Sequence, residues 1–331
     1  RKIVASVLAF LMVVSLIPVN SLMTKANAAS KTTFEGGKTV EDGTWKGWTW
    51  NVFGSSTDVT KAFATDTGNG GVTLEVTGDK GKINGSASDQ GLNTFLYELD
   101  KSYDFTITAQ AKVDTLAANA QAAFGLTIRD NVGAHGNTAK LTADKNNFAF
   151  VGGYGNQAAS GHGNAGYKTT ALAHTRLGES PEVGGTYDLA IQKVGDSVKL
   201  YFNGEVAAEC SADDLITDNA MYVGLFAARN AKVTFNNVKL AYTQDSSSVK
   251  VTTNVTAPKK TTYCAGNTYE DVDLTGFKAT VSVDGKEREI TASDCVVDMS
   301  NDPFAEVTDA GKLNLLYLGQ TIEVPITVIK E

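Results

Sequence analysis

A chain of 331 residues is long enough for two domains with hydrophobic cores after an N-terminal leader is set aside. Its 37 acidic and 29 basic side chains give a net charge of −8 at pH 7, which argues against nucleic acid as a partner. Three cysteines are too few for a disulfide framework.

Residues 1–28 have the pattern of a secretory signal peptide. Arg1 and Lys2 precede an apolar run from Ile3 to Val19, and an Ala-Asn-Ala tripeptide ends at Ala28. A membrane anchor is the alternative, but a serine and a proline interrupt a run that is barely long enough to cross a bilayer. We therefore expect a protein that is secreted or held at the cell surface, with no membrane insertion after signal cleavage.

The region from residue 32 to 243 is predicted to be all-β. Short runs of alternating apolar and polar residues, such as DFTITAQAKV at 104–113, are separated by Gly, Asn and Asp clusters. Turn pairs at Gly195-Asp196 and Asn203-Gly204 predict two successive hairpins. About a dozen strands of this kind fit one large antiparallel β-sandwich better than two small ones.

All three tryptophans lie in the segment TWKGWTWNVFG, residues 44–54. If WTWNV is a strand, Trp48, Trp50 and Val52 share one apolar face, which is the natural core face, although a sugar-binding platform on an open concave face is the alternative. Trp45 precedes that strand. It is therefore the better candidate for an exposed ring that stacks on a sugar.

Further along the chain, the segment GLTIRDN places Arg129 and Asp130 as a charged pair beside a central apolar strand. The pair is either a buried structural contact or part of a ligand or lyase site. Residues 152–166 are predicted to form a long flexible loop, and the edge of a ligand groove is the alternative, with His162 and the adjacent Tyr167 as candidate ligand contacts. The sequence GHGNAG in that loop lacks the preceding strand and following helix of a dinucleotide site.

The C-terminal quarter of the chain follows a short polar segment. Residues 244–249 are predicted to be an exposed linker that proteases would cut. After it, the alternating hairpin FKATVSVDGKEREIT predicts a small antiparallel sandwich over residues 250–331.

Two family resemblances agree with these patterns. GWTWNVFG, GLTIRDN, DLAIQKVGDSVKLYFNGE and YVGLFAARNAKVTFNNVKL together resemble the concanavalin A-like jelly-roll domains of secreted bacterial proteins, which often accompany pectate lyase and other polysaccharide-degrading modules. This resemblance covers residues 32–243 and implies a structural calcium ion with Glu35 and Asn236 as conceivable ligands; carboxylate and amide oxygens suit calcium. The turn Asp66–Asn69 is a second, poorer calcium candidate.

The segments TTYCAGNTYEDVDLTGFKATVSVDGKEREIT and LNLLYLGQTIEVPITV resemble bacterial immunoglobulin-like domains over residues 250–331. Cys264 stands where that family usually has a short polar residue. In an exported protein Cys264 and Cys295 could pair as a disulfide peculiar to this chain, and free buried thiols are the alternative.

Together these features predict a secreted, non-catalytic carbohydrate-binding or ancillary region of a polysaccharide-degrading or cell-surface protein, with a polysaccharide or cell-surface glycan as partner. No strand offers the paired carboxylates of a glycoside hydrolase. A fragment of a polysaccharide lyase or glycoside hydrolase is one alternative. A structural or adhesive surface protein without a glycan site is the other.

Overall fold

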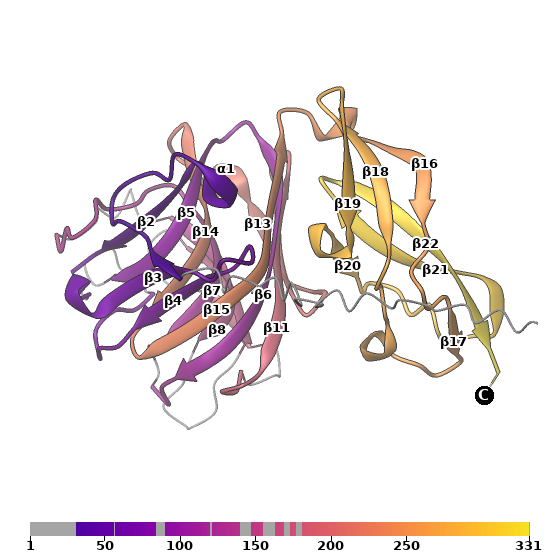
Figure 1. Cartoon of the computed structure of the whole chain (residues 1–331), viewed down its shortest axis with the longest axis horizontal. Coiled ribbons are helices and arrows are strands. Elements are labelled where there is room, and N and C mark those ends of the chain that lie inside the picture. Colours follow the sequence, from indigo (N-terminus) through magenta and orange to yellow (C-terminus); the bar gives the residue numbers. More distant parts are fainter. Residues whose placement is uncertain are drawn as a thin grey trace, which may run out of the picture.

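The computed structural model describes most of the chain from residue 31 onward. Two β-sandwiches of unequal size lie side by side, the larger drawn from indigo to orange and the smaller from orange to yellow (Figure 1). The predicted all-β fold with a large antiparallel sandwich is confirmed. The described residues, of which 163–168, 173–176 and 253 are described by their backbone alone, are 31–55, 57–83, 90–119, 121–139, 147–154, 163–168, 173–176 and 181–330.

One sheet of the large sandwich has eight antiparallel strands. In spatial order they are β1 (Thr32–Thr33), β3 (Ala62–Asp66), β4 (Val72–Val76), β15 (Ala231–Thr243), β6 (Asp104–Leu116), β11 (Thr186–Val194), β12 (Ser197–Phe202) and β13 (Glu205–Ser211). Both predicted hairpins are present, since β11 pairs with β12 and β12 with β13. Asn203 and Gly204 have φ angles of 49° and 82°, as a tight turn of this kind requires.

The other sheet has seven strands, which are β10 (Ala173–Arg176), β9 (Gly163–Lys168), β8 (Phe148–Tyr154), β7 (Ala123–Arg129), β14 (Ala220–Ala228), β5 (Leu92–Asp100) and β2 (Trp48–Phe53). The predicted loop over residues 152–166 is wrong at both ends, because Gly153 pairs with Gly163 in the β8–β9 ladder. A Cβ atom on Gly152 would collide with the carbonyl oxygen of Phe124 on the neighbouring strand. Gly152 is therefore explained by the close approach of two strand backbones, which leaves no room for a side chain, and not by a need for flexibility.

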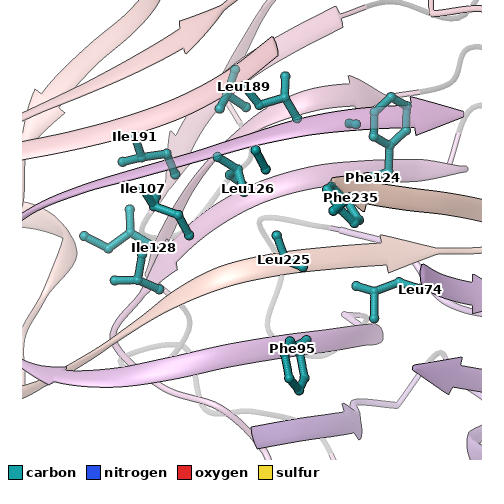
Figure 2. Close-up of a cluster of buried hydrophobic side chains, with 14 of the residues drawn as sticks. Leu74, Phe95, Ile107, Phe124, Leu126, Ile128, Leu189, Ile191, Leu225 and Phe235 are labelled. Carbon is teal, nitrogen blue, oxygen red and sulfur yellow. The ribbon is translucent and has the colours of Figure 1, made fainter. Parts of the chain in front are cut away.

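The core of the large sandwich lies between the inner faces of the two sheets (Figure 2). Trp48, Trp50 and Val52 all belong to it, with exposed fractions of 6%, 8% and 0%, so the predicted core face of the tryptophan strand is confirmed. The labelled side chains of Figure 2 are Leu74, Phe95, Ile107, Phe124, Leu126, Ile128, Leu189, Ile191, Leu225 and Phe235. Each large side chain buried in this way stabilises the fold by about 1.5–3 kcal/mol.

The outer face of the seven-stranded sheet is covered as well. A second apolar cluster lies on it, made of Phe53, Ile83, Leu92, Ala123, Phe148, Phe150, Phe226 and Ala228. The segment after β7 crosses towards the edge strand β2, where the Gly136 N–H donates a hydrogen bond to the Val52 carbonyl at 2.8 Å. The described part of this face is thus packed rather than open.

The small sandwich has a three-stranded and a four-stranded sheet. The first contains β16 (Lys250–Thr256), β18 (Lys278–Val283) and β19 (Lys286–Thr291), and the second contains β17 (Thr262–Cys264), β22 (Gln320–Ile329), β21 (Thr308–Tyr317) and β20 (Val296–Asp298). Only the β17–β22 pair of these described strands is parallel. Asp284, with a φ of 51°, begins the β18–β19 turn.

Helical segments are short. In the described part of the chain they are η1 (Gly43–Trp45), η2 (Val59–Lys61), α1 (Ala212–Leu215), η5 (Ser246–Ser248), η6 (Tyr269–Asp271) and η7 (Ala292–Asp294). In the part of the chain that the structure describes, no helix has the length and apolarity needed to cross a membrane.

The small sandwich packs on the outer face of the eight-stranded sheet. Thr108 Oγ1 donates a hydrogen bond to the Ser293 carbonyl at 2.6 Å, and Thr243 Oγ1 donates one to Asp284 Oδ1 at 2.6 Å. Beside these bonds lies an apolar cluster shared by the two sandwiches, made of Ala190, Tyr201, Val296 and Leu316. The Thr and Gln face of β6 is therefore partly an interface and not only a solvated surface.

The segment at residues 244–249 contributes to that interface. Ser246 is 8% exposed, its N–H contacts Asp104 Oδ2 at 3.4 Å, and its carbonyl accepts a hydrogen bond from Gln320 Nε2 at 3.0 Å. Asp104 is also close to the buried Lys193 ammonium, at 3.6 Å. The expectation of a fully exposed linker is wrong at Ser246, because both sandwiches contribute contacts to the η5 turn.

Candidate functional site

Trp45 does not offer an exposed ring. It is 4% exposed and packs edge-to-face against Trp48 and Phe95, with ring centroids 5.7 and 5.4 Å apart. The η1 turn folds it back onto the core just before β2 begins, which alternation along the strand could not predict. The prediction of a sugar-stacking ring at this position is therefore wrong.

The indole N–H groups of two buried tryptophans differ in their partners. Trp50 Nε1 donates to Asn93 Oδ1 at 2.7 Å, and Asn93 in turn donates to two backbone carbonyls. Trp45 Nε1 has no hydrogen-bond acceptor among the described residues. The first donor is satisfied inside the core, whereas the second is buried without a partner.

Arg129 is buried beneath the outer surface of the seven-stranded sheet. Its guanidinium carbon lies 5.4 Å from the centre of the Phe53 ring and 5.3 Å from that of Phe148. Its Nε atom donates to the Asn131 carbonyl at 2.9 Å, and Nη2 donates to Gln90 Oε1. Burial lowers the pKa of Arg129 to about 10, which leaves it charged at neutral pH.

Asp130 is buried next to it, at 1% exposure. Its carboxylate accepts hydrogen bonds from Asn147 N at 3.1 Å, Asn147 Nδ2 at 2.9 Å and Thr217 Oγ1 at 3.2 Å. Burial raises the pKa of Asp130, although the charge of Arg129 and these donors act in the opposite direction. Arg129 and Asp130 therefore organise the covering segments of the sheet and present no charge to a ligand.

Other predicted contacts are only partly described. His162 lies outside the described residues, and Tyr167 lies in β9 with its side chain outside the description. Glu35 is exposed and pairs with Lys38 at 2.6 Å. Asn236 lies beside the other calcium candidate, the Asp66–Asn69 turn, because a Cβ atom on Gly71 would come 3.2 Å from Asn236 Oδ1.

Calcium binding stays a prediction. The described residues contain no group of three or more His, Cys, Asp or Glu side chains arranged around a common point. In the turn, Asp66 Oδ1 accepts the Gly68 N–H at 2.8 Å, which is ordinary turn chemistry.

Of the two alternatives for Cys264 and Cys295, the structure has free thiols and no disulfide, and Cys210 is a free thiol as well. Cys295 is buried, and its sulfur lies 3.6 Å from the Thr291 carbonyl. Burial raises the pKa of Cys295, with the charge of Asp294 adding to the effect. Cys295 therefore acts as a small buried side chain, and Cys210 and Cys264 are half-buried.

A cavity of about 340 Å³ lies between the two sandwiches, and we call it the inter-sandwich cleft. One wall is the outer face of β6, β11 and β12, and the other is formed by η6, η7 and the β20 region. The volume is at the lower end of the range of ligand pockets, about 300–1,000 Å³. Its polar and aromatic lining includes Gln110, Asp188, Tyr201, Asn203, Asn237 and Tyr269, and its apolar lining includes Leu189, Val272, Leu274, Val296, Val297 and Met299.

Strand register brings the polar groups of the first wall together. Gln110 lies opposite Asp188 across the β6–β11 ladder, and Gln110 Nε2 donates to Asp188 Oδ1 at 3.2 Å. Asn203 in the β12–β13 turn accepts the Asp188 N–H on its Oδ1 atom at 2.9 Å. A bulge after Asn236 places Asn237 at a φ of 51°, and Asn237 completes this wall.

Two tyrosines line the cleft from opposite sandwiches. Tyr201 is 2% exposed and packs with Ala190 and Val296, yet its hydroxyl makes no hydrogen bond to any described residue. Burial, with the charges of Asp298 and then a glutamate, raises its pKa to about 12, so the hydroxyl keeps its proton. Tyr269 instead donates to the Asp298 carbonyl at 3.0 Å.

The arrangement offers both donors and acceptors next to aromatic and apolar surface. Amide groups and the Tyr201 hydroxyl can hydrogen-bond to the hydroxyls of a sugar, and the half-buried Tyr269 ring can pack on its C–H face. The sequence gives one signal for this site, the polar outer face of residues 104–113, but nothing local shows that a second domain closes over it.

Comparisons with known proteins found similarity in sequence and in fold. No protein-family model matches it. Pectate lyase L of Thermoclostridium stercorarium is 29% identical over 282 residues, which are 84% of this chain and 21% of that protein. The chain thus spans about a fifth of the length of this relative.

Solved structures are similar at low identity. A family 66 carbohydrate-binding module from Bacillus subtilis has a TM-score of 0.32 and 15% identity, covering 65% of this chain and 96% of the module. Lectin II from Ulex europaeus has a TM-score of 0.38 and 10% identity, covering 64% of this chain and 98% of the lectin. Both likenesses concern the fold alone.

Proposed function

We propose that the chain is a non-catalytic, carbohydrate-binding region of a secreted polysaccharide-degrading protein, and that the inter-sandwich cleft holds the glycan. One observation carries the proposal. Gln110, Asp188 and Asn203 form a joined polar wall, and the half-buried Tyr269 adds aromatic surface to the same cavity. Such a mixture of hydrogen-bonding groups and flat apolar surface matches the chemistry of a sugar ring.

The similarity to pectate lyase L supports the proposal that this region belongs to a polysaccharide-degrading protein. That protein is named for the degradation of a polysaccharide, and the shared stretch is 21% of its length. A region of this size beside a catalytic module would keep the enzyme close to its polymer by raising the local concentration of substrate. Export is part of the proposal and rests on the leader pattern of residues 1–28.

The contacts of Arg129 and Asp130 support a role without catalysis. A general base or acid must come within hydrogen-bond reach of the substrate. Arg129 is 0% exposed and is held between two phenylalanine rings, and the Asp130 carboxylate already accepts from Asn147 and Thr217. Moving either Arg129 or Asp130 towards a substrate would break these buried contacts, so both are poor candidates for catalytic residues.

Affinity electrophoresis of the full chain through gels that contain soluble polysaccharides tests the proposal. Tyr201→Phe removes the cleft hydroxyl and keeps the ring, and Gln110→Ala removes one amide of the polar wall. A lost neutral hydrogen bond is worth about 0.5–1.5 kcal/mol, so each variant should bind about 2- to 10-fold more weakly. Asp309→Asn is the control, because Asp309 is exposed on β21 away from the cleft lining.

Thermal unfolding separates binding from folding in this test. Tyr201→Phe should be about as stable as the parent protein, because the hydroxyl that it removes makes no hydrogen bond to a described residue. If neither cleft variant changed the retention on polysaccharide, the glycan would have to bind outside the inter-sandwich cleft. Absence of retention on every polysaccharide would favour the structural or adhesive alternative, and release of reducing or unsaturated sugar ends would favour an enzyme.

A further inference from the structure

The inter-sandwich cleft has a one-sided charge. Among the described residues that line it, Asp188 is the only aspartate or glutamate, and none is a lysine or an arginine. Asp188 also has one oxygen near Gln110 Nε2, so the nearest donor to this carboxylate is a neutral amide. A ligand in the cleft would meet a negative charge that no basic lining residue balances.

The surroundings of the cleft add to this charge. Apart from burial, the groups that raise the pKa values of Tyr201 and Tyr269 to about 12 are acidic, and Asp298 acts on both. Asp302 is the second acidic neighbour of Tyr269. A tyrosine that is surrounded by carboxylates reports a negative potential in its part of the cleft.

Basic side chains near the interface lie outside the cleft lining. Lys239 is opposite Thr108 in the β15–β6 ladder and is exposed, but it does not line the cleft. Arg288 interacts with Tyr242 and Tyr317, which also lie outside the lining. The cleft therefore lacks the Arg or Lys partner that a buried carboxylate ligand needs.

We propose that the inter-sandwich cleft selects neutral glycan segments and rejects polyuronates. This inference rests on the proposed function and adds its ligand class. A polyuronate carries one carboxylate on each sugar, so a bound segment would lose water around that charge and be placed next to Asp188. At a separation of several ångströms, the repulsion between two such charges lowers affinity by about tenfold or more. The cleft would then bind a polysaccharide other than pectate, the polymer that gives pectate lyase its name.

A pair of polymers that differ only in charge provides the main test. Highly methyl-esterified homogalacturonan and its de-esterified form have the same backbone, with the carboxyl groups capped or free. The full chain should be measured against both, and against β-glucan, xylan, galactan and alginate, in buffer with a chelator at low and at high salt. The expected result is strongest retention on an uncharged polymer, with de-esterified homogalacturonan and alginate bound at least tenfold more weakly.

Salt and one substitution check the cause. High salt should reduce the difference in affinity between neutral and acidic polymers, because it screens the repulsion between the polymer carboxylates and Asp188. Asp188→Asn should also reduce this difference in affinity, by about threefold or more. The matched charge change Asp309→Asn, at an exposed position of β21, should leave the difference unchanged. A difference in affinity that responds neither to salt nor to Asp188→Asn would overturn the electrostatic explanation.

Failures of the two proposals give different results. Equal or tighter binding of the de-esterified polymer and alginate would overturn the selection of neutral glycans and leave carbohydrate binding in place. Retention on no polymer at all would overturn carbohydrate binding, and the selection with it.

Discussion

Replacing Trp45 and Trp50 by phenylalanine should affect stability very differently, although both rings are buried. Their exposed fractions are 4% and 8%, and both belong to the same core cluster. They differ in one group, because Trp50 Nε1 donates to Asn93 Oδ1 at 2.7 Å, whereas Trp45 Nε1 has no acceptor among the described residues. The comparison therefore isolates the value of one buried hydrogen bond.

The magnitudes follow from surface area and hydrogen bonding. A change from Trp to Phe removes about 40 Å² of buried apolar surface, which is about 1 kcal/mol at ~25 cal/mol/Å². Trp50→Phe also leaves the Asn93 oxygen without its donor, at a further cost of about 1–3 kcal/mol. Trp45→Phe removes an unsatisfied donor of similar cost instead, so the two terms nearly cancel. We expect Trp50→Phe to lose about 2–4 kcal/mol and Trp45→Phe to change by less than about 1, or to be more stable.

Urea unfolding followed by far-ultraviolet circular dichroism measures both values, since tryptophan fluorescence would change with the substitutions themselves. Trp45→Ala serves as a check on burial and should lose about 3–5 kcal/mol, as a truncated core aromatic does. If Trp45→Phe lost as much stability as Trp50→Phe, the N–H group of Trp45 would have to be satisfied, and the reasoning would be wrong.

Other properties can be tested on the same protein. Limited proteolysis should not cut at Ser246–Ser248 in the native state, because Ser246 is buried between the sandwiches, and early cleavage there would contradict the packed interface. Mass spectrometry without reductant should find three free thiols, and an intact Cys264–Cys295 bond would refute this expectation. A thiol reagent at pH 8 should label Cys295 only slowly, because its thiol is buried and has a raised pKa. Burial raises the pKa of Asp130 in the folded state, so the folded protein holds that proton more tightly than the unfolded chain, and the resulting stability is present below pH 3.8 and lost as the pH rises through the folded value. The difference in unfolding free energy between the parent protein and Asp130→Asn should therefore change in favour of the variant as the pH is raised from 4 to 7, and a constant difference would contradict the raised pKa.

Features set by neighbouring residues were predictable from the sequence. Alternation placed Trp48, Trp50 and Val52 on the core face, and the Asn203-Gly204 pair marked a hairpin because few other residues adopt positive φ at both positions. These inferences depend on two or three adjacent residues, which tertiary contacts did not override.

Features set by distant residues were not predictable. Trp45 is buried because a single turn of η1 returns it to Phe95, about fifty positions away, and no periodicity records that return. Gly152 and Gly163 resemble loop residues, yet both lie in strands, and the backbone of Gly152 closely approaches that of Phe124. The cleft joins Gln110 to Tyr269 through the packing of two separate sandwiches, which only the structure reveals.

The apolar cluster between the sandwiches limits how these modules can be exchanged among proteins. Ala190 and Tyr201 belong to one sandwich, and Val296 and Leu316 belong to the other. A gene rearrangement that gave the large sandwich a new neighbour would expose Tyr201 to water and remove one wall of the cavity. The new neighbour would need matching apolar side chains at the same places to restore both. The two sandwiches should therefore travel between genes as a pair, and engineered fusions that keep them together should retain properties that either one loses alone.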